Sequence, residues 1–228
     1  MIASSAAPVQ VDIAALIDNS RVGPLQIRMF VLCALCLIID GFDVQSMGYV
    51  APAVLPDLGM PRAAMANILA AANVGLLVGS LLFTAAADKL GRRPVLIGST
   101  LFFGLMTLLT ARATSAEQLM ALRFIAGVGM GSLVPNATAL IGEYSPRRLR
   151  ITLMMTITVG FTAGAALGGF VAAWLIPQFG WRAVFYFGGT VPIVIAGLMF
   201  FWLPESLQFL VLKQRHLDRL GKWLTLID

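Results

Sequence analysis

The chain contains little charge, and this scarcity excludes an ordinary soluble domain. Asp, Glu, Lys and Arg together make up 12% of its 228 residues, whereas hydrophobic residues make up 59%. The mean hydropathy is +0.88. Soluble domains carry about 25% charged residues, because their surfaces face water. The composition therefore indicates a membrane protein.

Histidine and cysteine are also scarce, which argues against an enzyme or a metal protein. The single histidine, His216, stands in a basic tail, and Cys33 and Cys36 stand in an apolar run without a second pair of ligands. A metal site or a nucleophile with its base needs more such groups close together. We therefore expect no enzymatic activity, no cofactor and no bound metal, and we interpret both cysteines as helix-packing residues.

Long apolar segments are abundant by contrast. About 20 residues cross a bilayer as a helix, and backbone groups in lipid must pair within their own segment, which favours helices. Six segments qualify: 27–55, 64–87, 94–113, 117–142, 151–176 and 183–203. The predicted fold is an all-α membrane protein with an N-terminal segment at 1–26, six transmembrane helices within 27–203 and the start of a central loop at 204–228.

The distribution of basic residues predicts the orientation of these spans. Of 16 Lys and Arg residues, three fall on one side (Arg62, Arg112 and Arg182), Arg123 lies within a span, and twelve share the side of both termini: Arg21, Arg28, Lys89, Arg92, Arg93, Arg147, Arg148, Arg150, Lys213, Arg215, Arg219 and Lys222. Basic loops stay in the cytoplasm. We expect a multi-pass protein of the cell (inner) membrane with both termini cytoplasmic, surrounded by the lipid bilayer and without a nucleic-acid partner.

Two carboxylates, Asp40 and Asp43, stand in the middle of the first predicted span. A charge near the bilayer centre costs roughly 2.5–3.5 kcal/mol, so it is retained for a reason. Three residues apart, the two side chains share one helical face. They could merely mark a helix end at the membrane surface, but a functional role on a face directed to protein or water is the favoured interpretation.

The loop between the second and third predicted spans carries an acid and three bases around a glycine: Asp88, Lys89, Gly91, Arg92 and Arg93. Gly91 permits a tight reversal, and bases near a helix C-terminus offset the negative end of its dipole. Orientation in the membrane thus accounts for the bases. It does not account for Asp88, which is unfavourable at a helix C-terminus unless a base neutralises it.

This loop resembles the signature of the major facilitator superfamily, G-x-x-x-D-[RK]-x-G-[RK]-[RK], with Thr84 at the position of the first glycine. Two further stretches resemble superfamily motifs: Arg123-x-x-x-Gly127-x-Gly129 and Pro204-Glu205-Ser206. Three local features are similar to the aromatic acid/proton symporters within that superfamily: Asp40-Gly41-Phe42-Asp43, Val134-Pro135-Asn136-Ala137 and Leu203-Pro204-Glu205-Ser206-Leu207.

The resemblance implies the N-terminal half of a twelve-helix fold, built from two inverted three-helix repeats. A short internal repeat agrees with this, since Gly91-Arg92-Arg93-Pro94-Val95 recurs as Gly180-Trp181-Arg182-Ala183-Val184. We expect the chain to be a fragment whose partner is a missing C-terminal half; pairing of two six-helix copies is the alternative.

The resemblance also implies a function, namely proton-coupled uptake of an aromatic carboxylate such as a hydroxybenzoate. Asp40 and Asp43 would couple protons to the substrate, and Arg123 would hold the substrate carboxylate or pair with an aspartate, unless it is only a structural anchor. Asn73 and Asn136 would line the cavity or bridge helices, and Asp88, Lys89, Gly91, Arg92 and Arg93 would form a gating loop. Alternatives are a proton symporter for a sugar or another small metabolite, or an inactive half-transporter.

Overall fold

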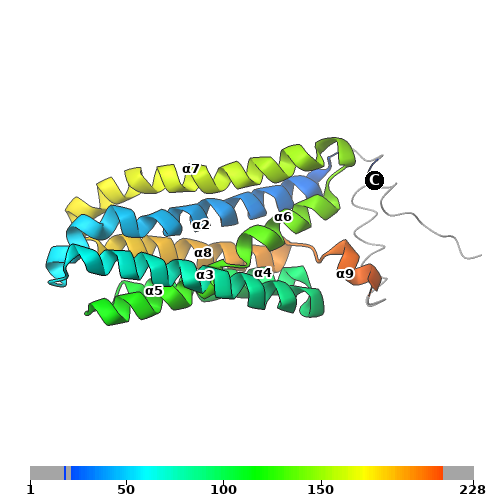
Figure 1. The fold of residues 1–228 in the computed structure, drawn as a ribbon. Coiled ribbons are helices and arrows are strands. Elements are labelled where there is room, and N and C mark those ends of the chain that lie inside the picture. Colours follow the sequence, from blue (N-terminus) through cyan, green and yellow to red (C-terminus); the bar gives the residue numbers. More distant parts are fainter. Residues whose placement is uncertain (1–17, 19–21, 213–228) are drawn as a thin grey trace, which may run out of the picture.

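The computed structural model describes residue 18 and residues 22–212, and in this part of the chain the only regular elements are helices. They form one elongated bundle (Figure 1): α2 (Pro24–Asp57), α3 (Arg62–Leu90), α4 (Arg92–Thr110), α5 (Ala116–Met130), α6 (Leu133–Tyr144), α7 (Arg147–Phe179), α8 (Arg182–Trp202) and α9 (Leu207–Leu212). The all-α prediction is confirmed. Most of the predicted N-terminal segment and the basic tail with His216 lie outside the described residues.

The predicted spans correspond to the long helices. Within the described residues, five stretches are long and apolar enough to cross a membrane, namely α3, α4, α5 with α6, α7 and α8, and α2 is not among them. The first predicted span is α2, which has 34 residues and continues without a break through its two carboxylates.

The fourth predicted span, 117–142, is divided in the structure, because α5 ends at Met130 and α6 begins at Leu133. Pro135 lies in the first turn of α6 and has no N–H to donate to the carbonyl of Gly131, so a continuous helix would lose a hydrogen bond there. The span is therefore two helices in series.

The pairing of the helices follows the expected inverted repeat. α2 packs mainly on α7, α3 on α5, and α4 on α8. If the first three spans are exchanged with the last three, the α2–α7 pair becomes the α5–α3 pair, and the α4–α8 pair maps onto itself. The prediction of two three-helix units of opposite orientation agrees with this arrangement.

Glycines allow the helices of the α2–α7 and α3–α5 pairs to approach each other closely. A Cβ on Gly41 of α2 would collide with the carbonyl oxygen of Phe161 on α7, and one on Gly164 of α7 would collide with that of Ile38. α3 and α5 make the equivalent contacts, at Gly75 and at Gly127. Small residues of this kind allow helices in membranes to approach each other, so Gly41 has a packing role inside the carboxylate element.

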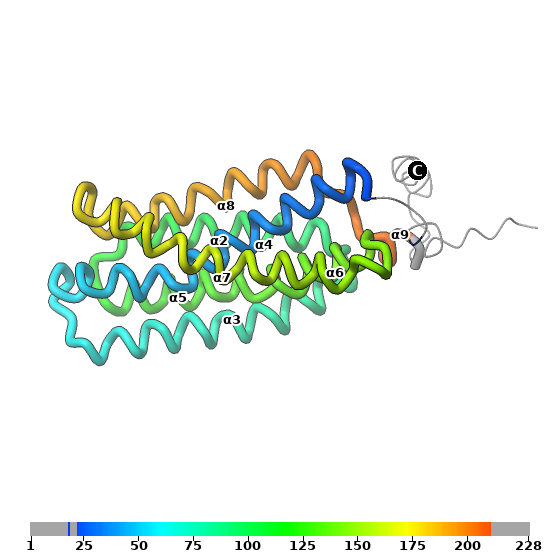
Figure 2. Tube along the Cα trace, turned by 90° about the horizontal axis from the view of Figure 1, so that it is seen from above, coloured from blue at the N-terminus to red at the C-terminus, as the bar shows by residue number. Residues whose placement is uncertain are grey.

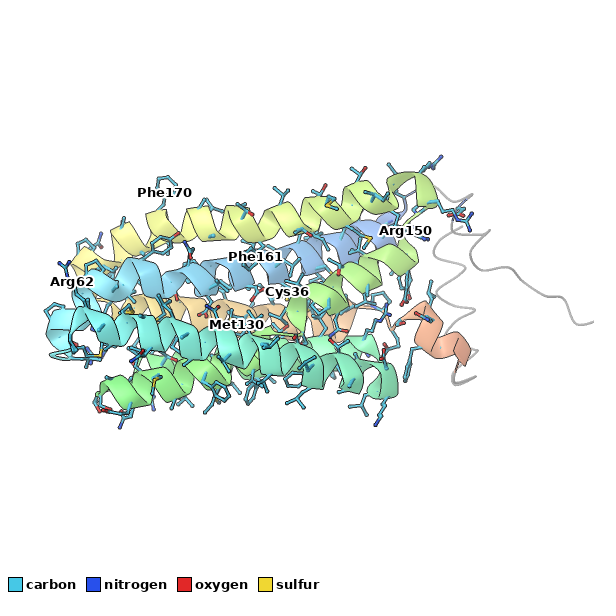
Figure 3. The ribbon with its side chains drawn as sticks, viewed as in Figure 1. Cys36, Arg62, Met130, Arg150, Phe161 and Phe170 are labelled. Carbon is cyan, nitrogen blue, oxygen red and sulfur yellow. The ribbon has the colours of Figure 1, made fainter. Side chains whose placement is uncertain are left out.

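The bundle has two distinct ends (Figures 1 and 2). The α9 end holds α9, the start of α2 and the α3–α4 and α6–α7 turns, while the opposite end holds the α2–α3, α4–α5 and α7–α8 connections. Figure 3 shows Arg150 at the α9 end, Arg62 at the opposite end and Cys36 inside the bundle. Phe170 points away from the bundle and is 76% exposed, which places an apolar surface on the outside of α7.

Candidate functional site

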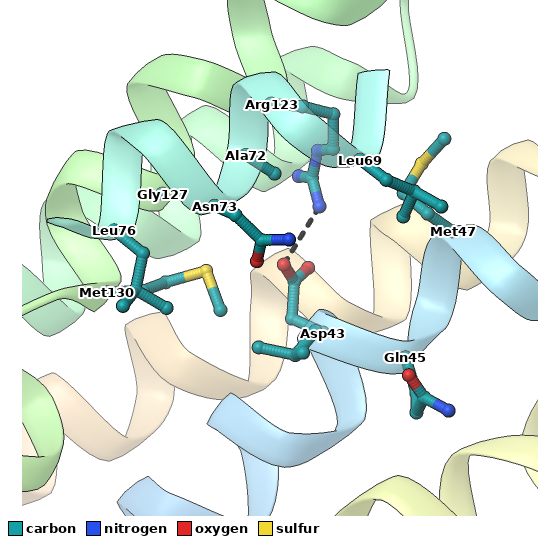
Figure 4. Close-up of a pocket in the computed structure, with 11 residues that line it drawn as sticks. Asp43, Gln45, Met47, Leu69, Ala72, Asn73, Leu76, Arg123, Gly127 and Met130 are labelled. Atoms are coloured by element: carbon teal, nitrogen blue, oxygen red, sulfur yellow. Dashed lines mark hydrogen bonds and ion pairs between the residues drawn. The ribbon is translucent and has the colours of Figure 1, made fainter. Parts of the chain in front are cut away.

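A buried ion pair joins α2 to α5 in the middle of the bundle (Figure 4). Arg123 Nη1 lies 2.8 Å from Asp43 Oδ2, and the two side chains are only 3% and 2% exposed. Sequence reasoning had selected both residues, and the structure brings them together across 80 positions of sequence. Each charge is compensated by the other, which is the usual condition for burying either one.

Helix α4 completes the surroundings of Arg123. Its Nη2 donates to Thr107 Oγ1 and to Thr110 Oγ1, both at 3.1 Å. The Thr107 hydroxyl also donates to Asp43 Oδ1 at 3.3 Å. The ring of Phe185 on α8 lies 5.0 Å from Arg123 Cζ, in a cation–π contact. The guanidinium is therefore held from three sides.

Sequence reasoning did not select Thr107, Thr110 or Phe185. The signal available was weak, since Thr107 and Thr110 are three residues apart and so share one face of an otherwise apolar helix. Threonine in a helix commonly bonds to its own backbone, as Thr110 does to Met106 O at 2.9 Å. Hydroxyls at this spacing therefore did not by themselves indicate a partner.

Asp40 lies one helical turn before Asp43 and has a different environment. It is 2% exposed, and its Oδ1 has no hydrogen-bond partner among the described residues. No salt bridge to Asp40 is formed in the described part of the chain. The two carboxylates thus share a helical face, as predicted, but only Asp43 has a cation.

A small cavity of about 170 Å³ opens beside the ion pair, between α2, α3 and α5. Asp43, Asn73 and Arg123 supply its polar atoms, and Figure 4 shows the Asn73 amide directed toward the ion pair. The remaining lining is mostly apolar, from Val44, Met47, Leu69, Ala72, Leu76, Gly127 and Met130, with Gln45 at its edge. Pockets that enclose a drug-sized ligand measure about 300–1,000 Å³, so this cavity by itself is small.

The second candidate cavity residue, Asn136, does not line this space. Asn136 is buried in α6, and its Nδ2 donates to the carbonyl of Ser132 at 3.0 Å. The same Ser132 carbonyl also accepts the backbone N–H of Asn136 at 3.1 Å, so both bonds lie at the start of α6. Asn73 and Asn136 therefore have different surroundings.

The predicted gating loop lies at the α9 end and holds several elements together. Gly91 ends α3 with a φ of 102°, a left-handed conformation that favours glycine. Arg92, the first residue of α4, forms an ion pair with Glu143 near the end of α6. The backbone N–H of Arg93 donates to Glu205 Oε1 at 3.1 Å. Asp88 and Lys89 lie exposed on the last turn of α3.

Residues after the sixth span join the same cluster. The Ser206 hydroxyl lies 2.9 and 2.8 Å from the two carboxylate oxygens of Glu143. The Tyr144 hydroxyl donates to the Glu205 carbonyl at 2.7 Å. Burial raises the pKa of the Glu205 carboxyl above its usual value, against the opposing effect of backbone N–H groups and of Arg93. We call Arg92, Glu143, Glu205 and Ser206 the α9-end cluster.

The opposite end carries a related cluster that sequence reasoning had identified only as a repeated motif. Gly180 ends α7 with a φ of 76°, and Arg182 begins α8. Arg182 Nη1 and the indole N–H of Trp181 both donate to Asp57 Oδ2, at 2.8 and 2.9 Å. These two donors lower the pKa of Asp57, the last residue of α2. We call Asp57, Trp181 and Arg182 the opposite-end cluster.

Comparison with known proteins places this geometry in a family. The sequence profile described as Major Facilitator Superfamily matches residues 33–216. The 4-hydroxybenzoate transporter PcaK of Pseudomonas aeruginosa is 42% identical over 210 residues, which cover 92% of this chain and 47% of that protein. The gallate transporter of Pseudomonas putida is 40% identical and is covered to 45%, along 90% of this chain. The chain thus spans about half the length of these relatives.

Solved structures agree on the fold. A proton:xylose symporter, XylE, superposes with a TM-score of 0.72 at 18% identity, and the match covers 82% of this chain and 46% of that chain. At such low identity the likeness shows the fold alone. The arrangement is that of the N-terminal half of the larger protein.

Proposed function

Because this chain belongs to the Major Facilitator Superfamily, we propose that its bundle forms half of a proton-coupled transporter that takes up an aromatic carboxylate such as a hydroxybenzoate. Two findings support the substrate class. Relatives at 42% and 40% identity are named as 4-hydroxybenzoate and gallate transporters. The cavity combines a buried cation with apolar walls, which suits an anion that carries a ring.

The observation that carries the proposal is the pairing of Asp43 with Arg123 beside this cavity, while Asp40, one turn away, forms no salt bridge with any described residue. A substrate carboxylate competes with Asp43 for Arg123, because both are anions that bind a guanidinium. A proton on Asp43 weakens the ion pair and so favours exchange. Binding of the anion and uptake of a proton are thereby linked.

Coupling to protons also offsets the electrical cost of moving an anion into the cell. An anion that enters a cell moves against a membrane potential worth about 2.3 kcal/mol per charge per 100 mV. One proton carried with each monovalent anion cancels this cost and adds the pH gradient as a driving force. Two acidic side chains in the middle of the membrane, Asp40 and Asp43, provide places for that proton.

For the membrane topology we propose a cell (inner) membrane location, with the α9 end in the cytoplasm. Arg92, Arg93 and the group Arg147, Arg148 and Arg150 lie at the α9 end, whereas the opposite end holds Arg62, Arg112 and Arg182. Basic residues concentrate on the cytoplasmic side of membrane proteins. The protein partner is a second six-helix half, because alternating access moves one half against the other around a shared site.

The test combines this chain with a second half of known identity. We define the reconstituted pair as residues 1–228 co-expressed with the half of the P. aeruginosa 4-hydroxybenzoate transporter that the chain does not match, and reconstituted in lipid vesicles. An inward proton gradient should drive saturable uptake of labelled 4-hydroxybenzoate. Xylose serves as the control for the sugar alternative and should neither enter nor compete.

The matched positive control replaces this chain with the relative's own first half. If that control accumulates 4-hydroxybenzoate while the reconstituted pair transports none of 4-hydroxybenzoate, gallate and benzoate, the proposed substrate class is wrong. Proton-driven uptake of xylose by the reconstituted pair would instead support the sugar alternative.

A further inference from the structure

The hydroxyl of Thr107 touches both members of the central ion pair. It accepts a hydrogen bond from Arg123 Nη2 at 3.1 Å and donates one to Asp43 Oδ1 at 3.3 Å. Its side chain is fully buried, and its methyl group would lie 3.6 Å from a Cβ on Gly188 of α8. Thr107 thus lies close to α8, and its hydroxyl forms hydrogen bonds to both charged side chains.

Thr110 provides the contrast within the same helix. It also accepts from Arg123 Nη2 at 3.1 Å and is equally buried, but its own hydrogen goes to Met106 O at 2.9 Å. Thr110 therefore touches the cation and not the carboxylate. The two threonines thus differ in where they donate: Thr107 to Asp43 Oδ1, Thr110 to its own helix backbone.

A hydroxyl can serve either protonation state of a neighbouring carboxyl, because it has one hydrogen and two lone pairs. When Asp43 is ionised, Thr107 donates to it. When an Asp43 oxygen takes a proton from a hydronium ion supplied by the solvent, that ion becomes water and the negative charge of Asp43 is neutralised. The new O–H donates to Thr107, whose own hydrogen turns away from Asp43. No other group gains or loses a proton in this step.

We propose that Thr107 is a positioning residue that couples the protonation of Asp43 to the freedom of Arg123. The proposal rests on the proposed function. In the empty site the Thr107 hydroxyl bridges Arg123 and ionised Asp43 through one hydrogen bond to each. After protonation the same hydroxyl accepts from Asp43 as well as from Arg123, so the hold on the guanidinium loosens, and Arg123 is free to bind the substrate carboxylate.

The groups that face Asp43 allow a pH measurement to be interpreted. Asp40 lies on the same helix and Arg123 on α5, and both carry titratable or charged groups. α3 contributes Asn73 and α4 contributes Thr107, neither of which is charged. Thr110 on α4 and Phe185 on α8 contact Arg123 and are also uncharged. α7 has no charged residue between Arg150 and its end at Phe179.

The first experiment needs no substrate. Residues 1–228 in lipid nanodiscs, with carbon-13 aspartate, are titrated by infrared spectroscopy, and Asp43 is assigned by difference from Asp43→Asn. Thr107→Val keeps the shape and removes the donor, so the protonated-carboxyl band of Asp43 should appear about one pH unit higher than in the unaltered chain. Thr110→Val should leave it unchanged, and Thr107→Ser should restore the unaltered midpoint.

A second variant protects the test if Thr107→Val fails to insert. Thr107→Cys has similar size and a weaker donor, so its midpoint should shift in the same direction by a smaller amount. Equal shifts in the Thr107 and Thr110 variants, or no shift in either Thr107 variant, would overturn the role of Thr107.

The second experiment measures uptake of 4-hydroxybenzoate by the reconstituted pair as a function of pH. Thr107→Val should move the pH profile by about one unit, whereas Thr110→Val should raise the half-saturation concentration about tenfold without moving the profile. If the unaltered pair transports nothing, the proposed function is wrong, while the infrared result still decides whether Thr107 couples the pair. An unmoved pH profile in a transporting Thr107→Val pair would overturn the proposal.

Discussion

The two ends of the bundle repeat each other, whereas its middle does not. At each end a glycine ends one helix, an arginine begins the next, and that arginine bonds to an acid near the end of another helix: Gly91, Arg92 and Glu143 in one case, Gly180, Arg182 and Asp57 in the other. Among the described residues, the middle holds the buried pair of Asp43 and Arg123, and Asp40 Oδ1 has no hydrogen-bond partner there.

Exposure separates these regions further. The side chains of the central pair are 3% and 2% exposed, those of Arg92 and Glu143 are 23% and 14%, and those of Arg182 and Asp57 are 39% and 44%. Charges in water cost little and contribute little, whereas buried charges are costly. The repeated ends therefore hold partly exposed ion pairs, whereas the unrepeated middle holds the charges that are most costly to bury.

The largest effect should follow from removing a carboxylate in the middle. Asp40→Asn or Asp43→Asn in the reconstituted pair should reduce proton-driven accumulation of 4-hydroxybenzoate at least a hundredfold, because asparagine keeps the shape but cannot carry the proton. The amount of chain in the membrane should stay the same, because the substitution leaves the length and the apolar residues of α2 unchanged. Undiminished accumulation against a gradient in both variants would disprove the coupling role.

The close contact behind the carboxylates should be nearly as sensitive. Gly41→Ala places a methyl group against the backbone of Phe161, so α2 and α7 must separate and the central pair must shift with them. We expect at least a tenfold loss of uptake and a lower melting temperature in detergent. Gly48→Ala, on the same helix with no atom within 4 Å of the added carbon, is the matched control. Equal effects of the two substitutions would refute the packing role.

At the α9 end, Asp88→Asn should slow transport about tenfold while substrate affinity changes less than twofold. Asp88 is exposed and lies far along α3 from the cavity, so it can affect the movement of the halves but has no contact with the substrate. Stopped-flow binding and initial rates of uptake measure the two quantities. A parallel loss of binding and transport would assign this loop to folding and not to gating.

The smallest effect should appear at the opposite end, and pH distinguishes the two clusters. Because the pKa of Asp57 is lowered, its carboxylate stays ionised and keeps its hydrogen bonds to Trp181 and Arg182 at every pH above the usual pKa of an aspartate. These bonds are lost only when the pH falls through the lowered pKa. The raised pKa of Glu205 means that ionisation destabilises the α9-end cluster as the pH rises through that value. Between pH 5 and pH 8, hydrogen-exchange protection should therefore decrease at the start of α4 and stay constant at the start of α8. The reverse pattern would contradict both assignments.

Much of the frame could be predicted from the sequence because apolar length and basic loops determine helices and their order. The short repeat at Gly91 and Gly180 also identified both helix reversals before any coordinates. The break before α6 was missed, although Pro135 was visible, because the apolar run continues across it. Composition alone does not distinguish one long helix from two in series.

The site was harder to predict than the frame. Asp43 and Arg123 could be selected because charge is rare in a membrane helix, but their pairing depends on the rotation of α2 and α5 about their axes. Thr107 escaped notice because a helical hydroxyl ordinarily bonds to its own backbone. For Asn136 the sequence left open whether it lines a cavity or packs between helices; in the structure its amide donates to the Ser132 carbonyl within its own helix segment.

The most direct test compares residues 1–228 alone with the reconstituted pair, in vesicles that contain equal amounts of chain, using labelled 4-hydroxybenzoate and an inward proton gradient. The account predicts that the chain alone inserts with both ends on one side and gives no saturable uptake, because Asp43 and Arg123 line only a small cavity that needs a second half to complete it. The reconstituted pair should show saturable uptake that disappears when the gradient is dissipated. Saturable, proton-dependent uptake by residues 1–228 alone would contradict the account and indicate a working assembly of identical halves.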